Sequence, residues 1–255
     1  MKKPEDFGIT KYDKEKFEKT GILDCFQSVY LRDRNLKKIP FQFGIVDGYF
    51  DCSHNQLKSL EGCPQEVKGD FYCYENQLKS LEGCPKEVNG YFDCSHNQLK
   101  SLEGCPQEVK GDFYCYENQL KSLEGCPQKV GGSFNCNDNK LKSLYGCPLE
   151  VRGFFKCSYN LLESLEGCPQ KVGGNFNCSY NQLKSLKGAP EIIKGYNLCC
   201  ENNPFDMSVK EWLHYLEKYQ KNGLYRSCRI VSDNSTYEST LKGLKDKLAI
   251  LEAFD

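Results

Sequence analysis

Residues 69–89 read Gly-Asp-Phe-Tyr-Cys-Tyr-Glu-Asn-Gln-Leu-Lys-Ser-Leu-Glu-Gly-Cys-Pro-Lys-Glu-Val-Asn, and Gly90 begins the phrase again. The most regular position of this 21-residue repeat is an asparagine, found at Asn55, Asn76, Asn97, Asn118, Asn139, Asn160, Asn181 and Asn202. A short, fixed period with apolar residues at fixed offsets is typical of a solenoid, in which each repeat forms one turn. Because one turn cannot bury its apolar face alone, we expect the turns to stack around one continuous core.

Two apolar columns precede the asparagine. Phenylalanine lies five residues before it, at Phe50, Phe71, Phe92, Phe113, Phe134, Phe155 and Phe176. Cysteine lies three residues before it, at Cys52, Cys73, Cys94, Cys115, Cys136, Cys157, Cys178 and Cys199. This period of two places both side chains on one face of a short strand, and strands of successive turns are expected to pair in parallel. Leucines such as Leu57 and Leu60 continue the core, and Gly62 and Pro64 suit a tight return of the chain.

The repeat resembles the leucine-rich repeat, with Val67, Phe71, Cys73, Asn76 and Leu78 in its apolar and asparagine positions. It is most similar to short Cys- and Phe-rich repeats of the type Asn-x-Leu-x-Ser-Leu-x-Gly-x-Pro, found in bacterial, bacteriophage and giant-virus proteins of unknown function. The resemblance implies a mostly β solenoid with a curved parallel sheet, few or no helices in the repeats, and an asparagine whose amide bonds backbone groups. Phenylalanine and cysteine replace the usual leucines, and a Gly-Cys-Pro return replaces a helix. Because the family has many functions, the resemblance says little about activity.

The solenoid is expected to cover residues 28–204. Residues 28–47 form a degenerate first turn, with Arg34 at the asparagine position, and eight asparagine-bearing turns follow. Residues 48–85 and 90–127 are identical. A surface duplicated as a block argues against a site refined residue by residue for one small substrate.

The two ends of the chain are expected to be caps, because a solenoid must close its open core. In residues 1–27 we expect a short helix near Tyr12–Lys19 that ends at Gly21. Residues 205–255 are expected to form an α-helical C-terminal cap. The sequences Ser208-Val-Lys-Glu211 and Ser235-Thr-Tyr-Glu238 each start a helix as a capping box. Between them Arg226–Val231 could add a strand, and the second helix carries an apolar stripe of Leu241, Leu244, Leu248 and Leu251.

Composition excludes some functions. The net charge of −1 gives no general attraction to nucleic acid or to an anionic membrane. A lysine column that includes Lys58 and Lys79 lies beside a glutamate column that includes Glu61 and Glu82, which favours a mutually neutralised face. The sequence has no apolar run long enough for a membrane span and no signal peptide at its N-terminus, so we expect a cytoplasmic protein.

The chain has 17 cysteines, and their arrangement favours free thiols over disulfides. Besides the column above, a second column holds Cys63, Cys84, Cys105, Cys126, Cys147 and Cys168. It continues with Ala189, which cannot form a cross-link. Buried free cysteine behaves as a small hydrophobe, so we expect reduced core thiols in a reducing compartment. A disulfide ladder between turns is the alternative, although parallel side chains suit that bond poorly.

The outward face of the strands carries tyrosine and aspartate in alternation. Six residues before the asparagines come Tyr49, Asp70, Tyr91, Asp112, Ser133, Phe154, Asn175 and Tyr196. Four residues before come Asp51, Tyr72, Asp93, Tyr114, Asn135, Lys156, Asn177 and Leu198. Nearer columns hold Tyr74, Tyr116, Tyr159, Tyr180, His54, Glu75, His96, Glu117 and Asp138. Alternation relieves repulsion between like charges on neighbouring strands, and tyrosine suits strands, so a purely structural role is one interpretation.

The other interpretation is recognition, because tyrosine is a typical anchor of protein-binding surfaces. We therefore expect a non-catalytic module that binds a partner protein, with a basic segment or a host protein as candidates, on a concave strand face. The binding residues are predicted to be Tyr72, Tyr74, Tyr91, Asp93, Tyr114 and Tyr116. The alternatives are a structural protein that self-associates through its caps and a glycan-binding repeat protein.

Catalysis and cofactors are not expected. His54 and His96 lie two turns apart, or roughly 9–10 Å, which is too far for one metal ion. A Cys–His nucleophile would need His214 beside Cys228 in the C-terminal cap, and nothing in the sequence brings them together.

Overall fold

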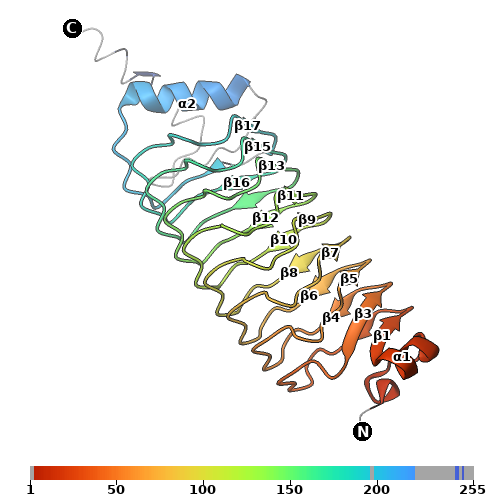
Figure 1. Cartoon of the computed structure of the whole chain (residues 1–255). Helices are drawn as coiled ribbons and strands as arrows, with labels where there is room; N and C mark the ends of the chain where they lie inside the picture. Colours follow the sequence, from red (N-terminus) through yellow and green to blue (C-terminus); the bar gives the residue numbers. More distant parts are fainter. Residues whose placement is uncertain (1–2, 196–197, 222–244, 247–248, 250–255) are drawn as a thin grey trace.

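The computed structural model describes residues 3–195, 198–221, 245–246 and 249. Two parallel sheets of nine strands each run the length of a regular stack (Figure 1). Each turn contributes one short strand to each sheet, and strands of successive turns are neighbours. The fold is therefore a parallel β solenoid with few helices, as the repeat predicted.

We call the sheet that carries the repeat's phenylalanines the phenylalanine sheet and the other the valine sheet. The phenylalanine sheet contains β2 (Val29–Tyr30), β4 (Phe50–Asp51), β6 (Phe71–Tyr72), β8 (Phe92–Asp93), β10 (Phe113–Tyr114), β12 (Phe134–Asn135), β14 (Phe155–Lys156), β16 (Phe176–Asn177) and β18 (Leu198–Cys199). The valine sheet contains β1 (Ile22–Cys25), β3 (Gln42–Val46), β5 (Glu66–Val67), β7 (Glu87–Val88), β9 (Glu108–Val109), β11 (Lys129–Val130), β13 (Glu150–Val151), β15 (Lys171–Val172) and β17 (Ile192–Ile193).

The valine sheet was not anticipated from the sequence. Its strands within the repeats are two residues long, so they show no alternation of their own, and only the recurring valine marks them. Three residues, such as Lys68-Gly69-Asp70, join a valine strand to the next phenylalanine strand. Gly69 is required at this corner, because a Cβ atom there would lie 2.9 Å from the carbonyl carbon of Gly48 one turn below. The glycine column therefore lets successive turns stack closely.

The buried asparagine ladder confirms the role expected from the resemblance. The Nδ2 of Asn97 donates to the carbonyl oxygens of Cys73 (3.0 Å), Cys94 (3.2 Å) and Ser95 (3.0 Å). Its Oδ1 accepts from the backbone N–H of Leu78 at 2.9 Å. One amide thus satisfies four backbone groups in two adjacent turns, where unpaired groups would be costly.

The last turn departs from the predicted register. Asn203, not Asn202, completes the ladder: its Nδ2 donates to Cys178 O at 3.1 Å, and its Oδ1 accepts from Leu183 N at 3.1 Å. Cys200 is buried, whereas the predicted Cys199 is half-buried. Leu198, predicted to point outward, is buried and pairs with Phe176.

The physical reason is one inserted residue. Val172 pairs with Ile193, 21 positions on, but Phe176 pairs with Leu198, 22 positions on. The insertion therefore lies between Ile193 and Leu198, a segment that includes residues 196–197 outside the described part of the chain.

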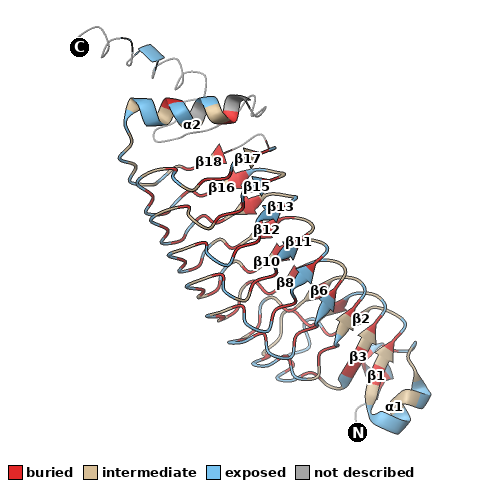
Figure 2. Cartoon of the chain, turned by 45° about the horizontal axis from the view of Figure 1, so that its top comes forward, coloured by how far each residue is buried: buried red, intermediate tan, exposed pale blue. Residues whose placement is uncertain are grey.

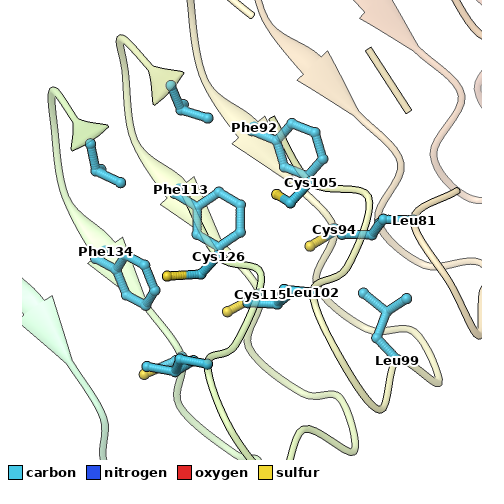
Figure 3. Packing of buried hydrophobic residues seen from close by; sticks show 14 of the residues in the cluster. Leu81, Phe92, Cys94, Leu99, Leu102, Cys105, Phe113, Cys115, Cys126 and Phe134 are labelled. Carbon is cyan, nitrogen blue, oxygen red and sulfur yellow. The ribbon is translucent and has the colours of Figure 1, made fainter. Parts of the chain in front are cut away.

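The core runs between the two sheets and the leucine-bearing returns, and burial alternates with exposure along every turn (Figure 2). Successive phenylalanine rings lie 5.2–5.9 Å apart from Phe50 to Phe176. The two cysteine columns lie in the same interior, where Cys94 and Cys105 are near each other (Figure 3). The cysteines of both columns from Cys52 to Cys178 are free thiols, as predicted.

The thiols also form weak hydrogen bonds between turns. The Sγ of Cys84 donates to Gly104 O at 3.0 Å, and the Sγ of Cys126 donates to Gly146 O at 3.1 Å. Burial raises the pKa of both thiols to about 12. The thiols are therefore neutral core groups near pH 7, and each donates to a carbonyl of the next turn, which valine or alanine could not do.

At the N-terminal end a 3-10 helix (Pro4–Phe7) and α1 (Lys14–Thr20) cover the first turn. Asp13 caps α1 by accepting from Lys16 N, and Gly21 ends the helix at a φ of 72°, in agreement with the predicted position. The strand β1 follows directly and pairs with β3, so this segment also extends the valine sheet.

At the C-terminal end α2 (Val209–Lys221) lies across the top of the stack (Figure 1). Leu213 and Tyr219 are buried, and the Tyr219 hydroxyl donates to Pro190 O at 3.0 Å. The capping box is present, since Glu211 accepts from Ser208 N and Oγ. The second capping box, the strand predicted at Arg226–Val231 and the four leucines of the apolar stripe lie outside the described residues. Within the described part, no helix combines the length and apolar character that crossing a membrane requires.

Candidate partner-binding face

The candidate site is the outward face of the phenylalanine sheet over its first half. In each strand the phenylalanine side chain enters the core, so the next residue points outward. Strand pairing places Tyr72 beside Asp93 and Asp93 beside Tyr114. Three of the six predicted residues are thus direct neighbours on adjacent strands.

The six residues differ in exposure. Tyr91 is the most open, with 48% of its surface exposed. Tyr72, Tyr74, Asp93, Tyr114 and Tyr116 are half-buried. They pack on one another, because the Tyr72 and Tyr74 rings meet edge-on at 6.3 Å and the Tyr114 and Tyr116 rings do the same. The face is therefore an ordered aromatic layer with few freely projecting side chains.

The tyrosine hydroxyls are held by aspartates of the neighbouring column. Tyr72 donates to Asp70 at 2.8 Å, and Tyr114 donates to Asp112 at 2.7 Å. Desolvation, together with these bonds to a carboxylate, raises the pKa of both phenols. Asp70 also accepts from Tyr91 N at 2.8 Å, which joins two turns. Asp70 and Asp112 therefore have structural roles that account for them fully.

Asp93 and its counterpart Asp51 are held differently. One oxygen of Asp93 accepts from Ser95 N at 2.9 Å and from Ser95 Oγ at 2.5 Å, and Asp51 makes the same two bonds to Ser53. Among the described residues, the second carboxylate oxygen of each accepts no hydrogen bond. Burial raises the pKa of Asp93, since desolvation outweighs the two bonds from Ser95. Asp93 is consequently an incompletely solvated carboxylate in an aromatic surface.

Several members of this face were missed in the prediction. Tyr30, 51% exposed, meets Tyr49 edge-on at 5.3 Å and the two hydroxyls are hydrogen-bonded. Arg32 donates to the Tyr74 hydroxyl and lies 5.6 Å from the centre of its ring. Both residues belong to the degenerate first turn, whose departures from the consensus concealed them. The only sequence signal that could have placed them on this face was their spacing, since Tyr30 lies 21 residues before Asp51 and Arg32 lies 21 residues before Ser53.

Further along the solenoid the face changes character. Phe154 stacks on Tyr114 at 6.2 Å, and the Lys156 amine lies 4.6 Å from the centre of the Phe154 ring. Asn135 stands where the alternation would place the next aspartate, and Lys156 stands where it would place the next tyrosine. The acidic aromatic surface therefore ends near β10.

One edge of the sheet carries a column of imidazoles and carboxylates. His54 Nδ1 lies 2.9 Å from Glu75, and His96 Nδ1 lies 2.9 Å from Glu117. Each histidine ring also meets a tyrosine edge-on, Tyr74 or Tyr116, which links this column to the aromatic face. No group of three or more potential ligands suitable for a metal ion is present among the described residues. His214 is exposed on α2, and its hypothetical partner Cys228 lies outside the described residues.

The valine sheet presents a different outward surface. Its outward positions are mainly glutamate and lysine, with an ion pair of 3.4 Å between Lys129 and Glu108. A shallow hollow of about 680 Å³ lies here, bordered in part by Lys110, Arg152 and the 75%-exposed Leu149. This surface lacks the aromatic layer of the phenylalanine sheet.

Comparison with known proteins gives no match to a family model and no significant match to a curated protein.

Proposed function

We propose that this chain is a non-catalytic module that binds a partner protein on the outward face of the phenylalanine sheet. The observation that carries the proposal is the layer of tyrosines around Asp51 and Asp93 on the outward face, where one oxygen of each carboxylate accepts from a serine and the other accepts no hydrogen bond from the described residues. Tyrosine contributes apolar area and a polar group at low entropic cost, and a large exposed aromatic surface is uncommon without a partner. The acidic residues favour a basic partner.

The proposal includes two finer points. The asparagine ladder supports a leucine-rich-repeat type of solenoid, and the buried free thiols support a reducing, intracellular location. An origin among viral or bacterial proteins, with a host protein as partner, is supported only by the resemblance of the repeat.

The test is a pull-down from lysate of the source cell or its host, followed by mass spectrometry. The wild-type chain is compared with Tyr72→Arg/Tyr114→Arg and, because those two rings are half-buried, with the exposed Tyr91→Ala. Tyr145→Ala is the matched control, since Tyr145 is 64% exposed but lies on the return loops. We expect a protein that binds the wild type and the control with equal affinity in purified form and binds the face variants at least tenfold more weakly. Equal binding by all folded variants would contradict the proposal.

A further inference from the structure

The strand register creates two similar groups of residues on the phenylalanine sheet. Asp51 lies between Tyr30 and Tyr72 on the adjacent strands, and Asp93 lies between Tyr72 and Tyr114. We call the first group, with Tyr49, carboxylate box 1 and the second, with Tyr91, carboxylate box 2.

Each box offers a cation two kinds of contact. The free oxygen of the central aspartate can accept from an ammonium or guanidinium group, and tyrosine rings beside it attract the same charge through their faces. In box 2 the carboxylate is already partly desolvated, so less hydration is lost when a cation arrives. Tyr72 and Tyr114 lie close enough to Asp93 and Tyr91 for these groups to contribute to their raised pKa values.

The distance between the boxes selects a ligand conformation. The boxes are two turns apart, which is about 9.6 Å at the usual strand spacing. A polyproline II helix rises about 3.1 Å per residue with three residues per turn, so every third side chain lies on one face at about 9.3 Å intervals. A β-strand places side chains of one face about 6.8 Å apart, which does not match the boxes.

We propose that the face binds a polyproline II segment with lysine or arginine at every third residue, lying along the solenoid axis. Successive cations occupy boxes 1 and 2. This inference rests on the proposed function and specifies its partner. The segment spans β2 to β10, because Asn135 and Lys156 provide no further carboxylate in this column. Box 2 dominates, since Arg32 lies close enough to Asp51 to interact with its charge.

The experiment measures binding of labelled synthetic peptides by fluorescence anisotropy. The peptides are proline-rich and have the same composition. Each carries two lysines, placed at positions i and i+2, i and i+3, or i and i+4. We expect the three-residue spacing to bind at least fivefold more tightly than the others. Asp93→Asn keeps the bonds from Ser95 but removes the charge, and should weaken this binding about tenfold. Glu87→Gln removes an equal charge from the valine sheet and should change binding less than twofold.

Circular dichroism of each variant checks folding. Equal affinity for the three spacings, or an equal effect of Asp93→Asn and Glu87→Gln, would overturn the inference. In that case a protein partner that is still lost in Tyr91→Ala would leave the proposed function standing, so the two failures are distinguishable. Absence of binding by every peptide at low salt would also overturn the inference.

Discussion

Residues 48–85 and 90–127 have the same sequence but different neighbours. We call them copy 1 and copy 2. Their local structure is the same. Asp51 and Asp93 each accept a hydrogen bond from the hydroxyl of the serine two residues later, and His54 and His96 both have a φ angle of 51°. The backbone of a turn is therefore specified by its own 21 residues.

Contacts across turns differ between the copies. In copy 1 the Tyr74 ring contacts Arg32, which lies two turns earlier. The counterpart of Tyr74 in copy 2 is Tyr116, and the residue two turns before Tyr116 is a tyrosine, Tyr74. Asn55 is half-buried at the degenerate end of the stack, whereas Asn97 is buried within it. The environment of a side chain, and with it the contribution of that side chain to the free energy of unfolding, is thus set by position in the stack. The duplication supplies a matched control for each residue.

The largest expected effect tests whether the core is equivalent in both copies. Phe50 and Phe92 are both fully buried, and each contacts phenylalanine rings on two sides. Phe50→Ala and Phe92→Ala should each lower the free energy of unfolding by about 4 kcal/mol. Urea denaturation followed by circular dichroism measures both values. A difference above about 1 kcal/mol would show that the core is not uniform along the stack.

The asparagine ladder should separate the copies. Asn97→Ala removes the partner of four buried backbone groups and should cost about 3 kcal/mol of unfolding free energy. Asn55→Ala should cost only about 1 kcal/mol, because Asn55 is half-buried and water can replace part of its hydrogen bonding. The same denaturation experiment compares them. Equal losses would mean that burial does not determine how much each asparagine of the ladder contributes to the free energy of unfolding.

The thiols should behave identically in both copies at alkaline pH. Burial raises the pKa of Cys84 and Cys126 from the usual value of 9.0 to about 12. Above about pH 9 only the unfolded chain loses these protons, so stability falls as pH rises toward 12. Each thiol should contribute about 1.4 kcal/mol to the loss between about pH 8 and about pH 10.

Cys84→Ala and Cys126→Ala should each reduce that loss by this amount. Chemical denaturation at the two pH values gives the comparison, and the double variant should show the sum. A pH dependence identical to that of the wild type in either single variant would contradict the assignment of the alkaline loss to the buried thiols.

Much of this architecture could be predicted because one residue type occupies each core position in nearly every turn. The positions of Phe92, Asn97 and Leu99 follow directly from the period. The valine sheet was missed because a two-residue strand such as Glu87–Val88 has no periodicity. The register of the last turn was missed because two adjacent residues, Asn202 and Asn203, fit the pattern and only pairing distinguishes them.

The candidate face was predictable in composition but not in geometry. The sequence placed Tyr72, Asp93 and Tyr114 in outward columns, and strand register makes them neighbours. It could not show that Tyr72 is tied to Asp70 while one oxygen of Asp93 stays free, because rotamers decide this. Tyr30 and Arg32 were missed because a degenerate turn has few consensus residues to align.

The smallest expected effect concerns Arg32, which distinguishes the outward face of copy 1 from that of copy 2. A double-mutant cycle between Arg32→Ala and Tyr74→Phe, which removes the hydroxyl that accepts from Arg32, should give a coupling of about 0.5–1 kcal/mol, as for an exposed hydrogen bond. The matched cycle with Tyr116→Phe should give none. Because Arg32 also opposes cations near Asp51, Arg32→Ala should strengthen binding of the three-spaced peptide about twofold. Weaker binding would instead identify Arg32 as a contact of the ligand, and copy 2 alone would then carry the acidic recognition site.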